Sequence, residues 1–250
     1  MARALVTGAG QRLGQAMAVA LARRGYDVAV HYATSDEGAA ETVAAIEACG
    51  RTAITVQADL LDEAQTKALF AESVAALGGP ITCLINNASI FEDDTMRSST
   101  RESWDRHMES NLRAPYVLTQ FMAEQGLEAT RDAQGEPEAA GLVVNMLDQR
   151  IRNLTPEFST YTLAKMGLWA LTQTAAQGLA PHIRVNGIAP GPTLQGAHQT
   201  PEAFAEERAK TVLGRGVGMD DIVAALSYLL DARGVTGQAI CVDGGQHLSW

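Results

Sequence analysis

The chain has 250 residues, 46% hydrophobic and 19% charged, which is enough for one sizeable core and suits a buried sheet covered by helices. Its net charge of −10 comes without a basic stripe, which argues against a nucleic-acid partner because nothing offsets phosphate charge. No apolar run approaches membrane-spanning length and no leader precedes the first strand, so we expect no membrane partner and a cytoplasmic location.

No stretch of linker-like composition divides the chain, so we expect a single domain over residues 1–250. Its three cysteines, Cys49, Cys83 and Cys241, are widely spaced and stand mostly in apolar contexts. They are predicted to be reduced thiols. No Cys-x-x-Cys motif and no histidine pair at ligand spacing occurs, so we expect no metal site.

The first element is a short β-type run over residues 3–7, followed by a glycine-rich turn up to Gly14 and a helix over 16–24. Glycines at such a turn let the backbone approach a diphosphate, whose charge is favoured at the helix N-terminus. Ordinary strand-to-helix loops also use glycine. Because this turn stands at the very start of an alternating β/α pattern, it favours a dinucleotide site.

The second strand is predicted over residues 26–32 and ends at His31 and Tyr32. In NAD-binding folds an acidic residue near this strand end pairs with the ribose hydroxyl, but none stands here. Arg12, in the glycine turn, could reach the same ribose. A cation without a carboxylate favours a 2′-phosphate and hence NADPH, whereas the alternative makes Arg12 a solvated surface cation.

A helix over 36–49 and a strand over 52–57 follow, and then Asp59 precedes a helix over 62–77. Asp59 could receive the adenine amino group or cap that helix, and the two roles are compatible. A further buried strand over 81–89 ends in small polar residues, which we expect beside the nicotinamide half of a cofactor.

Phe91 is an aromatic residue in a polar loop, either an anchor packed on the core or a stacking surface for a flat heteroaromatic substrate. A long helix is predicted over 103–125, and it carries Asn111, which must be exposed or bonded to something buried. The polar stretch 125–140 is predicted to be a surface loop without catalytic interest.

The middle of the chain holds the strongest candidate site. An apolar run over 141–146 predicts a buried strand, and Asp148 follows its end, where an open parallel sheet has its ligand crevice. A Thr-Pro pair at 155–156 predicts a helix start. On that helix Tyr161 and Lys165 share one face, and an ammonium beside a phenol eases transfer of the phenolic proton. Alone, the pair is a weak signal, because most such pairs are surface neighbours.

The remaining elements are a strand over 182–188, an irregular segment over 190–218, a helix over 220–230 and a strand ending at Asp243. The irregular segment at the carboxyl edge suits a substrate-covering lid, and an inert excursion is the alternative. Seven β-runs alternating with about six helices predict one doubly wound α/β domain, with a seven-stranded parallel sheet and helices on both faces.

Several short motifs together resemble the short-chain dehydrogenase/reductase family over the whole chain. They are Thr7-Gly8…Gly14, Asn86-Asn87-Ala88, Asn111, Tyr161-x-x-x-Lys165, Arg184-Val185-Asn186, Pro190-Gly191 and Asp243-Gly244-Gly245. The resemblance implies a Rossmann-type fold, Tyr161 as general acid/base, Lys165 lowering its pKa and holding the nicotinamide ribose, and Asn111 supporting a proton-relay water. The family places a substrate-orienting serine thirteen residues ahead of the tyrosine, where this chain has Asp148.

Further residues resemble the pteridine reductase branch of this family. They are Asp148, Arg12 in place of the middle motif glycine, His31-Tyr32…Ser35 and Ser89-x-Phe91. In that branch the arginine touches cofactor and pterin, and the phenylalanine stacks on the pterin ring opposite the nicotinamide. The C-terminal run 243–248 is similar to bacterial dihydromonapterin and alternative dihydrofolate reductases. Thr34 replaces an arginine frequent in pteridine reductases, leaving the 2′-phosphate contact to Arg12, His31 and Ser35.

The predicted catalytic residues are Asp148, Tyr161, Lys165 and Asn111. The residues predicted to bind NADP(H) are Gly8, Arg12, Leu13, Gly14, His31, Tyr32, Ser35, Ala58, Asp59, Leu60, Asn87, Ala88, Ser89, Met146, Tyr161, Lys165, Pro190, Gly191 and Thr193. The residues predicted to bind a pterin or folate-like substrate are Arg12, Ser89, Phe91, Asp148 and Tyr161.

Three functions are weighed. The favoured hypothesis is NADPH-dependent reduction of a C=N bond in a pterin or dihydropterin, because a carboxyl group can pair with or protonate ring nitrogens. The alternative is a carbonyl reductase for ketoacyl, sugar or steroid-like substrates, and the third is a non-catalytic NADP-binding regulatory protein. Intact Asn111, Tyr161 and Lys165 argue against the third. The family implies a homotetramer, with the Trp169 helix and the C-terminal tail as plausible interface elements.

Overall fold

A seven-stranded sheet forms the centre of the computed structural model, which describes residues 2–196 and 199–249. All its neighbouring strands are parallel, in the order β3-β2-β1-β4-β7-β8-β9. Its strands are β1 Arg3–Val6, β2 Asp27–Tyr32, β3 Ala53–Gln57, β4 Cys83–Asn86, β7 Gly141–Met146, β8 Ile183–Pro190 and β9 Ala239–Val242. The predicted doubly wound α/β class with a seven-stranded parallel sheet is confirmed.

Successive residues of the central strands enter two different cores, as the period of a β-strand requires. Val6, Val28 and Ile85 belong to one apolar cluster, whereas Leu5 and Leu84 belong to the other. A strand that is buried on both faces needs apolar residues at consecutive positions, which is why these strands read as unbroken apolar runs.

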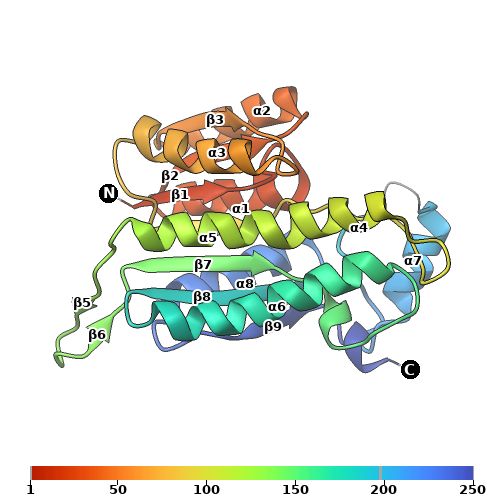
Figure 1. The fold of residues 1–250 in the computed structure, drawn as a ribbon. Coiled ribbons are helices and arrows are strands. Elements are labelled where there is room, and N and C mark those ends of the chain that lie inside the picture. Colours follow the sequence, from red (N-terminus) through yellow and green to blue (C-terminus); the bar gives the residue numbers. More distant parts are fainter. Residues whose placement is uncertain (1, 197–198, 250) are drawn as a thin grey trace.

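Helices cover both faces of the sheet (Figure 1). The first core packs against α1, α2 and α8, and the second packs against α3, α5 and α6. The α-helices are α1 Arg12–Arg23, α2 Asp36–Glu47, α3 Glu63–Ala76, α4 Arg101–Met108, α5 Ala114–Glu124, α6 Ser159–Leu179, α7 Pro201–Ala209 and α8 Met219–Asp231. None of the described helices combines the length and apolar character that crossing a membrane requires.

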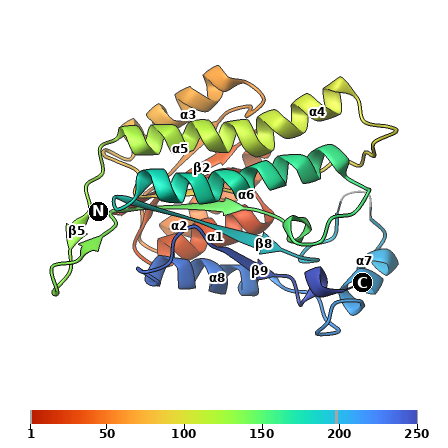
Figure 2. The ribbon, with the colours of Figure 1, turned by 60° about the horizontal axis from the view of Figure 1, so that its bottom comes forward.

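The strand order reverses between β1 and β4, because β2 and β3 extend the sheet on one side of β1 and the later strands extend it on the other. A parallel sheet with such a reversal opens a crevice at its carboxyl edge. The glycine turn, the loop after β4 and Asp148 all follow strand ends at this edge. Figure 2 shows that α7 and the C-terminal turn η3 (Gln246–Leu248) lie at the same end of the molecule as the start of α6.

The predicted helical segment over 103–125 is confirmed, but its middle is not a regular α-helix. The chain forms α4, then the π-helical turn η1 (Glu109–Arg113), and then α5. The wider turn carries Asn111, and π-bulges of this kind are frequent at functional sites. Apolar periodicity cannot reveal such a turn, because the chain remains helical on both sides of it.

The predicted helix start at 155–156 is also wrong. α6 begins at Ser159, and the residue before it, Phe158, takes a left-handed conformation with φ 55°. Thr155 instead accepts a hydrogen bond from the Arg150 guanidinium, in the loop after the 3-10 turn η2 (Gln149–Ile151). The cap that sets the true start comes from a distant loop.

The stretch 125–140 contains more order than the predicted surface loop. Strands β5 (Thr130–Arg131) and β6 (Pro137–Glu138) pair in an antiparallel ribbon that projects from the sheet (Figure 1). Two-residue strands carry too little alternation to be recognised from sequence.

Candidate active site

The Tyr161 phenol and the Asp148 carboxylate meet at the carboxyl edge of the sheet. Asp148 follows β7, and Tyr161 lies in the first turn of α6. The phenol donates a hydrogen bond of 2.8 Å to Asp148 Oδ2, and the Tyr161 side chain is buried. The Arg150 backbone N–H donates to Asp148 Oδ1 at 2.8 Å and fixes the carboxylate. The two predicted groups therefore come together as one hydrogen-bonded pair.

Burial governs the protonation of this pair. Burial raises the pKa of Tyr161 well above its ordinary value, and the charge and hydrogen bond of Asp148 raise it further. Burial also raises the pKa of Asp148, although hydrogen bonds from Arg150 and Tyr161 act against it. Burial and the adjacent Asp148 carboxylate both raise the pKa of the phenol, and the role of Lys165 in lowering it stays a prediction.

Lys165 lies one helical turn after Tyr161 and is buried with it. Its ammonium donates a 2.7 Å hydrogen bond to the carbonyl of Met146 and stands 5.5 Å from the centre of the Tyr161 ring. Burial lowers the pKa of Lys165 to about 8, opposed by the charge of Asp148. The ammonium is thus held beneath the phenol by the last residue of β7.

Asn111 joins the π-helical turn to the loop after β4. Its Oδ1 accepts from the Ile90 N–H at 2.8 Å, and its Nδ2 donates to the Ile90 carbonyl at 2.8 Å. The side chain is 1% exposed, so the predicted choice for a mid-helix asparagine is resolved as bonded to a buried group. Ile90 stands directly between Ser89 and Phe91, and Asn111 therefore fixes both predicted substrate residues.

The backbone of the glycine turn packs so closely that it leaves no room for a side chain at Gly14. A Cβ on Gly14 would lie 2.1 Å from the Gly8 carbonyl oxygen, so only glycine allows this approach of two backbones. Asn87 Nδ2 donates to the carbonyls of Thr7 and Gly8 at 2.8 and 3.1 Å and holds the turn. In the described structure no side chain caps the start of α1, so its first N–H groups fit an anion.

Arg12 has φ 54°, a value normally taken by glycine, at the position where the resemblance expects the middle motif glycine. Its guanidinium donates to the Gln195 carbonyl at 3.1 Å and so reaches the segment after β8. Ser35, the residue before α2, lies beside Gly10, whose added Cβ would meet the Ser35 carbonyl at 2.9 Å. Ser35 thus lies against the glycine turn, while the Arg12 guanidinium reaches from that turn to residue 195.

His31 is buried and bridges two backbones. The Gly8 N–H donates to His31 Nδ1 at 3.0 Å, so the proton stands on Nε2, which lies 3.1 Å from the Ala58 carbonyl. Burial lowers the pKa of His31 to about 4. Both ring nitrogens are thus engaged by the backbone, and the ring holds the glycine turn rather than reaching a phosphate directly.

The other predicted cofactor residues lie at neighbouring strand ends. Ala58 and Leu60 are buried after β3, whereas Asp59 is exposed. The side chain of Asp59 accepts from the Leu61 N–H, and α3 is capped by Asp62 instead, so the predicted cap by Asp59 is wrong. Of the remaining members, Leu13 lies in the first turn of α1, Tyr32 and Pro190 are the last residues of β2 and β8, and Ala88, Gly191 and Thr193 lie in the loops after β4 and β8.

The Phe91 ring lies next to the catalytic pair. Its centre is 4.8 Å from that of Tyr161 in an edge-to-face arrangement, and 47% of the residue is exposed. Ser89 is exposed, and a hydrogen bond from it acts to lower the pKa of Tyr161. Both predicted substrate residues therefore lie at the reacting group.

Sequence reasoning missed the partner of Phe91. The Phe158 ring stacks on it with centres 4.3 Å apart and planes within 7°, and the Arg150 guanidinium lies 4.7 Å above Phe158. An aromatic residue three positions before Tyr161 was the available signal. It also missed Asp94, Thr160 and His107, whose contacts join segments far apart in sequence and leave no local pattern.

The segment 190–218, which was expected to be irregular, contains the helix α7, while residues 197 and 198 lie outside the described residues. The Arg208 guanidinium of α7 donates to the carbonyls of Pro192 and Val217, both at 2.8 Å. One side chain thus ties together the two ends of the segment.

We expect Gly14→Ala to lower the thermal unfolding midpoint, because its Cβ would collide with the Gly8 carbonyl. Overpacking of this kind costs about 1–3 kcal/mol. Gly178→Ala is the matched control, since it also lies on a helix and its Cβ would meet nothing within 4 Å. Equal midpoints for the two variants would contradict the close approach.

We expect His31 to make the protein acid-sensitive. In the unfolded chain this histidine takes a proton near its ordinary pKa, whereas the folded protein resists protonation until about pH 4. Its contribution is therefore complete above about pH 6.5 and is lost as the pH falls towards about 4. Urea unfolding should show a loss of about 2 kcal/mol between about pH 7 and about pH 5, and His31→Gln should remove that dependence.

Comparison with known proteins identifies the family. A family model described as enoyl-(acyl carrier protein) reductase matches residues 8–247. A short-chain dehydrogenase/reductase of Armillaria gallica is 33% identical over 255 residues, covering 97% of this chain and 94% of that protein. FolM alternative dihydrofolate reductase 1 of Brucella suis, solved with NADP, is 40% identical, with a TM-score of 0.90 and coverage of 100% of this chain and 96% of that chain.

The angucycline C-6 ketoreductase LanV, solved with bound NADP, is 31% identical, with a TM-score of 0.88 and coverage of 99% of this chain and 96% of that chain. These matches extend over nearly the entire sequence and agree with the geometry of Asp148, Tyr161 and Lys165. The chain belongs to the short-chain dehydrogenase/reductase family and is an oxidoreductase of that family.

Proposed function

We propose that the protein is an NADPH-dependent reductase of a pterin or dihydropterin ring. The observation that carries this proposal is the Asp148–Tyr161 hydrogen bond of 2.8 Å beside the exposed ring of Phe91. A carboxyl group can pair with or protonate ring nitrogens, and an aromatic face suits a flat heterocycle. A serine in place of Asp148 would instead suit a ketone oxygen.

NADP(H) fits the residues at the carboxyl edge of the sheet. The glycine turn and the uncapped start of α1 suit its diphosphate, and Arg12 and Ser35 flank the region of the 2′-phosphate. No carboxylate follows β2 before Asp36, which favours a phosphate over a free ribose hydroxyl. When bound, the cofactor supplies the hydride for the reduction.

Proton supply falls to the chain's own side chains. As hydride reaches a ring carbon, negative charge develops on the adjacent nitrogen, and that nitrogen needs a proton. Tyr161 is the proposed general acid, and the hydrogen bond to Asp148 lets the carboxyl group return a proton to the phenol. Lys165 stays beneath the phenol and favours the ionised intermediate state of the pair. General acid catalysis of this kind contributes about 10²–10⁴-fold.

The finer substrate assignment draws support from FolM alternative dihydrofolate reductase 1, which is similar over the whole chain. Dihydromonapterin, dihydrobiopterin and dihydrofolate-like compounds all carry the ring that the site suits. The alternative is reduction of a ketone, and the similarity to the ketoreductase LanV favours it. Asp148 weighs against that alternative, because a serine hydroxyl at this position suits a ketone oxygen, whereas a carboxyl group suits ring nitrogens.

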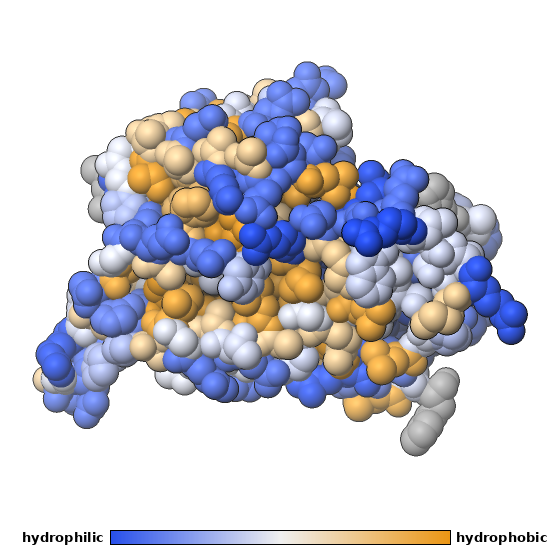
Figure 3. Space-filling model, in the orientation of Figure 1, coloured by the Kyte–Doolittle hydropathy of each residue, from blue (hydrophilic) through white to orange (hydrophobic). Residues whose placement is uncertain are grey.

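The family-based proposal of a homotetramer has a surface to support it. Apolar side chains gather along α5 and α6 on the face shown in Figure 3. Tyr116 of α5 and Leu163 of α6 are 42% and 46% exposed, which is high for large apolar residues. We also propose a cytoplasmic location and a substrate-covering role for the segment 190–218.

A substrate comparison with Asp148→Ser tests the function. We expect the wild type to oxidise NADPH with pterins, and the variant to lose about 10²-fold or more of this rate while retaining or gaining activity on ketones. Tyr161→Phe should fold and bind cofactor but lose most turnover on any substrate. NADPH oxidation by ketones alone in the wild type would favour the carbonyl reductase.

The pH dependence should carry the signature of Asp148. A proton donor must be protonated, so the rate of pterin reduction should fall as the pH rises through the raised pKa of Asp148. Asp148→Asn should remove this limb of the profile. Steady-state rates at saturating NADPH, measured from about pH 5 to about pH 9, check the expectation.

We expect Arg12→Ala to weaken binding of NADPH about tenfold or more, because a charge-assisted contact with the 2′-phosphate is worth about 1.5–3 kcal/mol. Binding of NADH should change little, which gives an internal control. Fluorescence titration with both cofactors measures the ratio. An equal loss for the two cofactors would assign Arg12 to the lid contact with Gln195 alone.

A further inference from the structure

The start of the helix that carries Tyr161 is held by a residue from another loop. α6 has no cap of its own, because its N-cap residue, Phe158, is left-handed and makes no side-chain hydrogen bond. The backbone carbonyl of Asp94 accepts from the Ser159 N–H at 3.1 Å, and Asp94 Oδ1 accepts from the Thr160 N–H at 3.0 Å. Asp94 thus serves as a cap from 66 residues away in the chain.

The second carboxylate oxygen of Asp94 extends this contact to α4. Asp94 Oδ2 accepts from the Thr160 hydroxyl at 2.5 Å and from the Ser103 hydroxyl at 3.0 Å. Burial acts to raise the pKa of Asp94, but the hydrogen bonds from Thr160 and Ser103 outweigh it and hold the pKa below its ordinary value. Asp94 therefore presents a buried carboxylate, 3% exposed, to the positive end of the α6 dipole.

A buried histidine completes the network and sets its direction. The Glu92 N–H donates to His107 Nε2 at 3.2 Å, which places the ring proton on Nδ1. His107 Nδ1 lies 2.7 Å from the Thr160 hydroxyl and donates to it, and that hydroxyl donates in turn to Asp94. Each polar group of this hydrogen-bonded network has a partner, so the network has one pattern of donors and acceptors.

The network connects the two halves of the proposed substrate site. Asp94 stands three residues after Phe91 in the same loop, and Thr160 immediately precedes Tyr161. The ring centres of Phe91 and Tyr161 are 4.8 Å apart. A small shift of the Phe91 loop against α6 therefore changes the distance between the proposed stacking surface, Phe91, and the proposed general acid, Tyr161. Positioning errors of about 1 Å can cost about 10²-fold in rate.

We propose that Asp94 is a positioning residue that fixes the Phe91 loop against the start of the Tyr161 helix through Thr160. The proposal rests on the proposed function for the role of Phe91, while the contacts themselves stand independently of the substrate. It differs from ordinary helix capping because the effect reaches the substrate ring as well as the stability of α6.

The Thr160 side chain offers the sharpest test. Thr160→Val keeps the shape but removes the hydroxyl between His107 and Asp94, and Thr160→Ser restores it. With a pterin substrate we expect Thr160→Val to raise KM and lower kcat about tenfold each, with NADPH binding unchanged, and Thr160→Ser to stay close to wild type. Wild-type KM and kcat in Thr160→Val would overturn the proposal.

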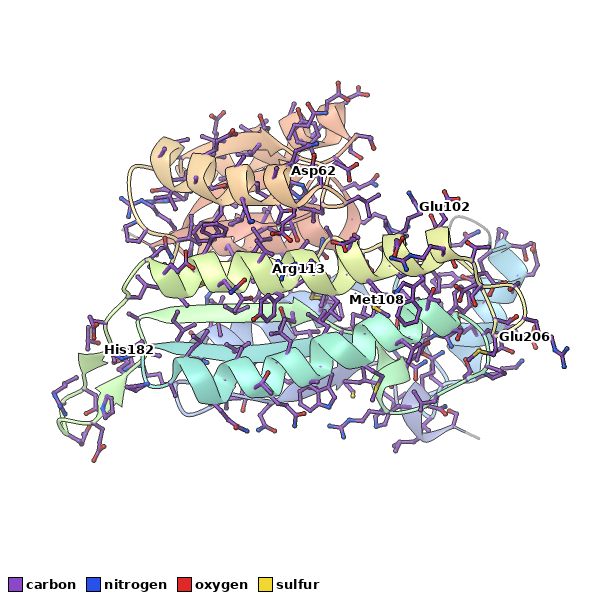
Figure 4. The ribbon with its side chains drawn as sticks, viewed as in Figure 1. Asp62, Glu102, Met108, Arg113, His182 and Glu206 are labelled. Atoms are coloured by element: carbon purple, nitrogen blue, oxygen red, sulfur yellow. The ribbon has the colours of Figure 1, made fainter. Side chains whose placement is uncertain are left out.

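Asp94→Ala with its control separates positioning from stability. Asp62 caps α3, accepting from the Ala64 and Gln65 N–H groups at 2.8 and 3.3 Å, and it stands at the start of that helix (Figure 4). We expect Asp62→Ala to lower thermal stability without changing KM, whereas Asp94→Ala should raise KM about tenfold even well below its unfolding temperature. The same KM change in both variants would show a general stability effect and overturn the proposal.

Hydrogen exchange provides a readout that needs no substrate. We expect Asp94→Ala to accelerate exchange at the amides of Ser159 and Thr160 and in the loop around Phe91, with the end of α6 unchanged. If the wild type failed to reduce pterins, the proposed function would fail, yet this measurement would still test the link. Unchanged exchange at Ser159 and Thr160 would refute it.

Discussion

The hydrogen bond between the Tyr161 phenol and the Asp148 carboxylate is the contact on which the rest of the site depends. Tyr161 is buried and Asp148 is partly buried, and burial raises the pKa of both groups because it disfavours their ionised forms. Asp148 follows the end of β7, and Tyr161 lies in the first turn of α6, the helix that connects β7 to β8. Lys165 supplies the nearby positive charge from the same helix face.

Two buried histidines show how the framework supports this pair. His31 links the glycine turn to the end of β3, and His107 links α4 to the start of α6. In each ring one nitrogen accepts from a backbone N–H, so the other must carry the proton. Each neutral imidazole thus links two segments of the chain that meet at the crevice.

Much of the fold followed from local patterns. Consecutive apolar residues indicated the strands that are buried on both faces. The glycine turn and the spacing of Tyr161 and Lys165 indicated that the site lies at the carboxyl edge of the sheet. The start of α6 was misplaced because its cap, Asp94, lies in another loop, and the π-helical turn at Asn111 leaves the apolar periodicity intact. His31 was expected at a phosphate because sequence gives the position of a residue on a strand but not which polar partners bury it.

The stack of Phe91 on Phe158 changes what an incoming ring must overcome. A ligand that binds the covered face of Phe91 must displace the Phe158 ring rather than water. The affinity of such a ligand therefore depends on how much better than Phe158 it stacks on Phe91. Electron-poor heterocycles stack on a phenyl face better than another phenyl does, whereas an aliphatic chain offers no such advantage. For the ring substrate proposed above, Phe158 is therefore a competitor for that face of Phe91.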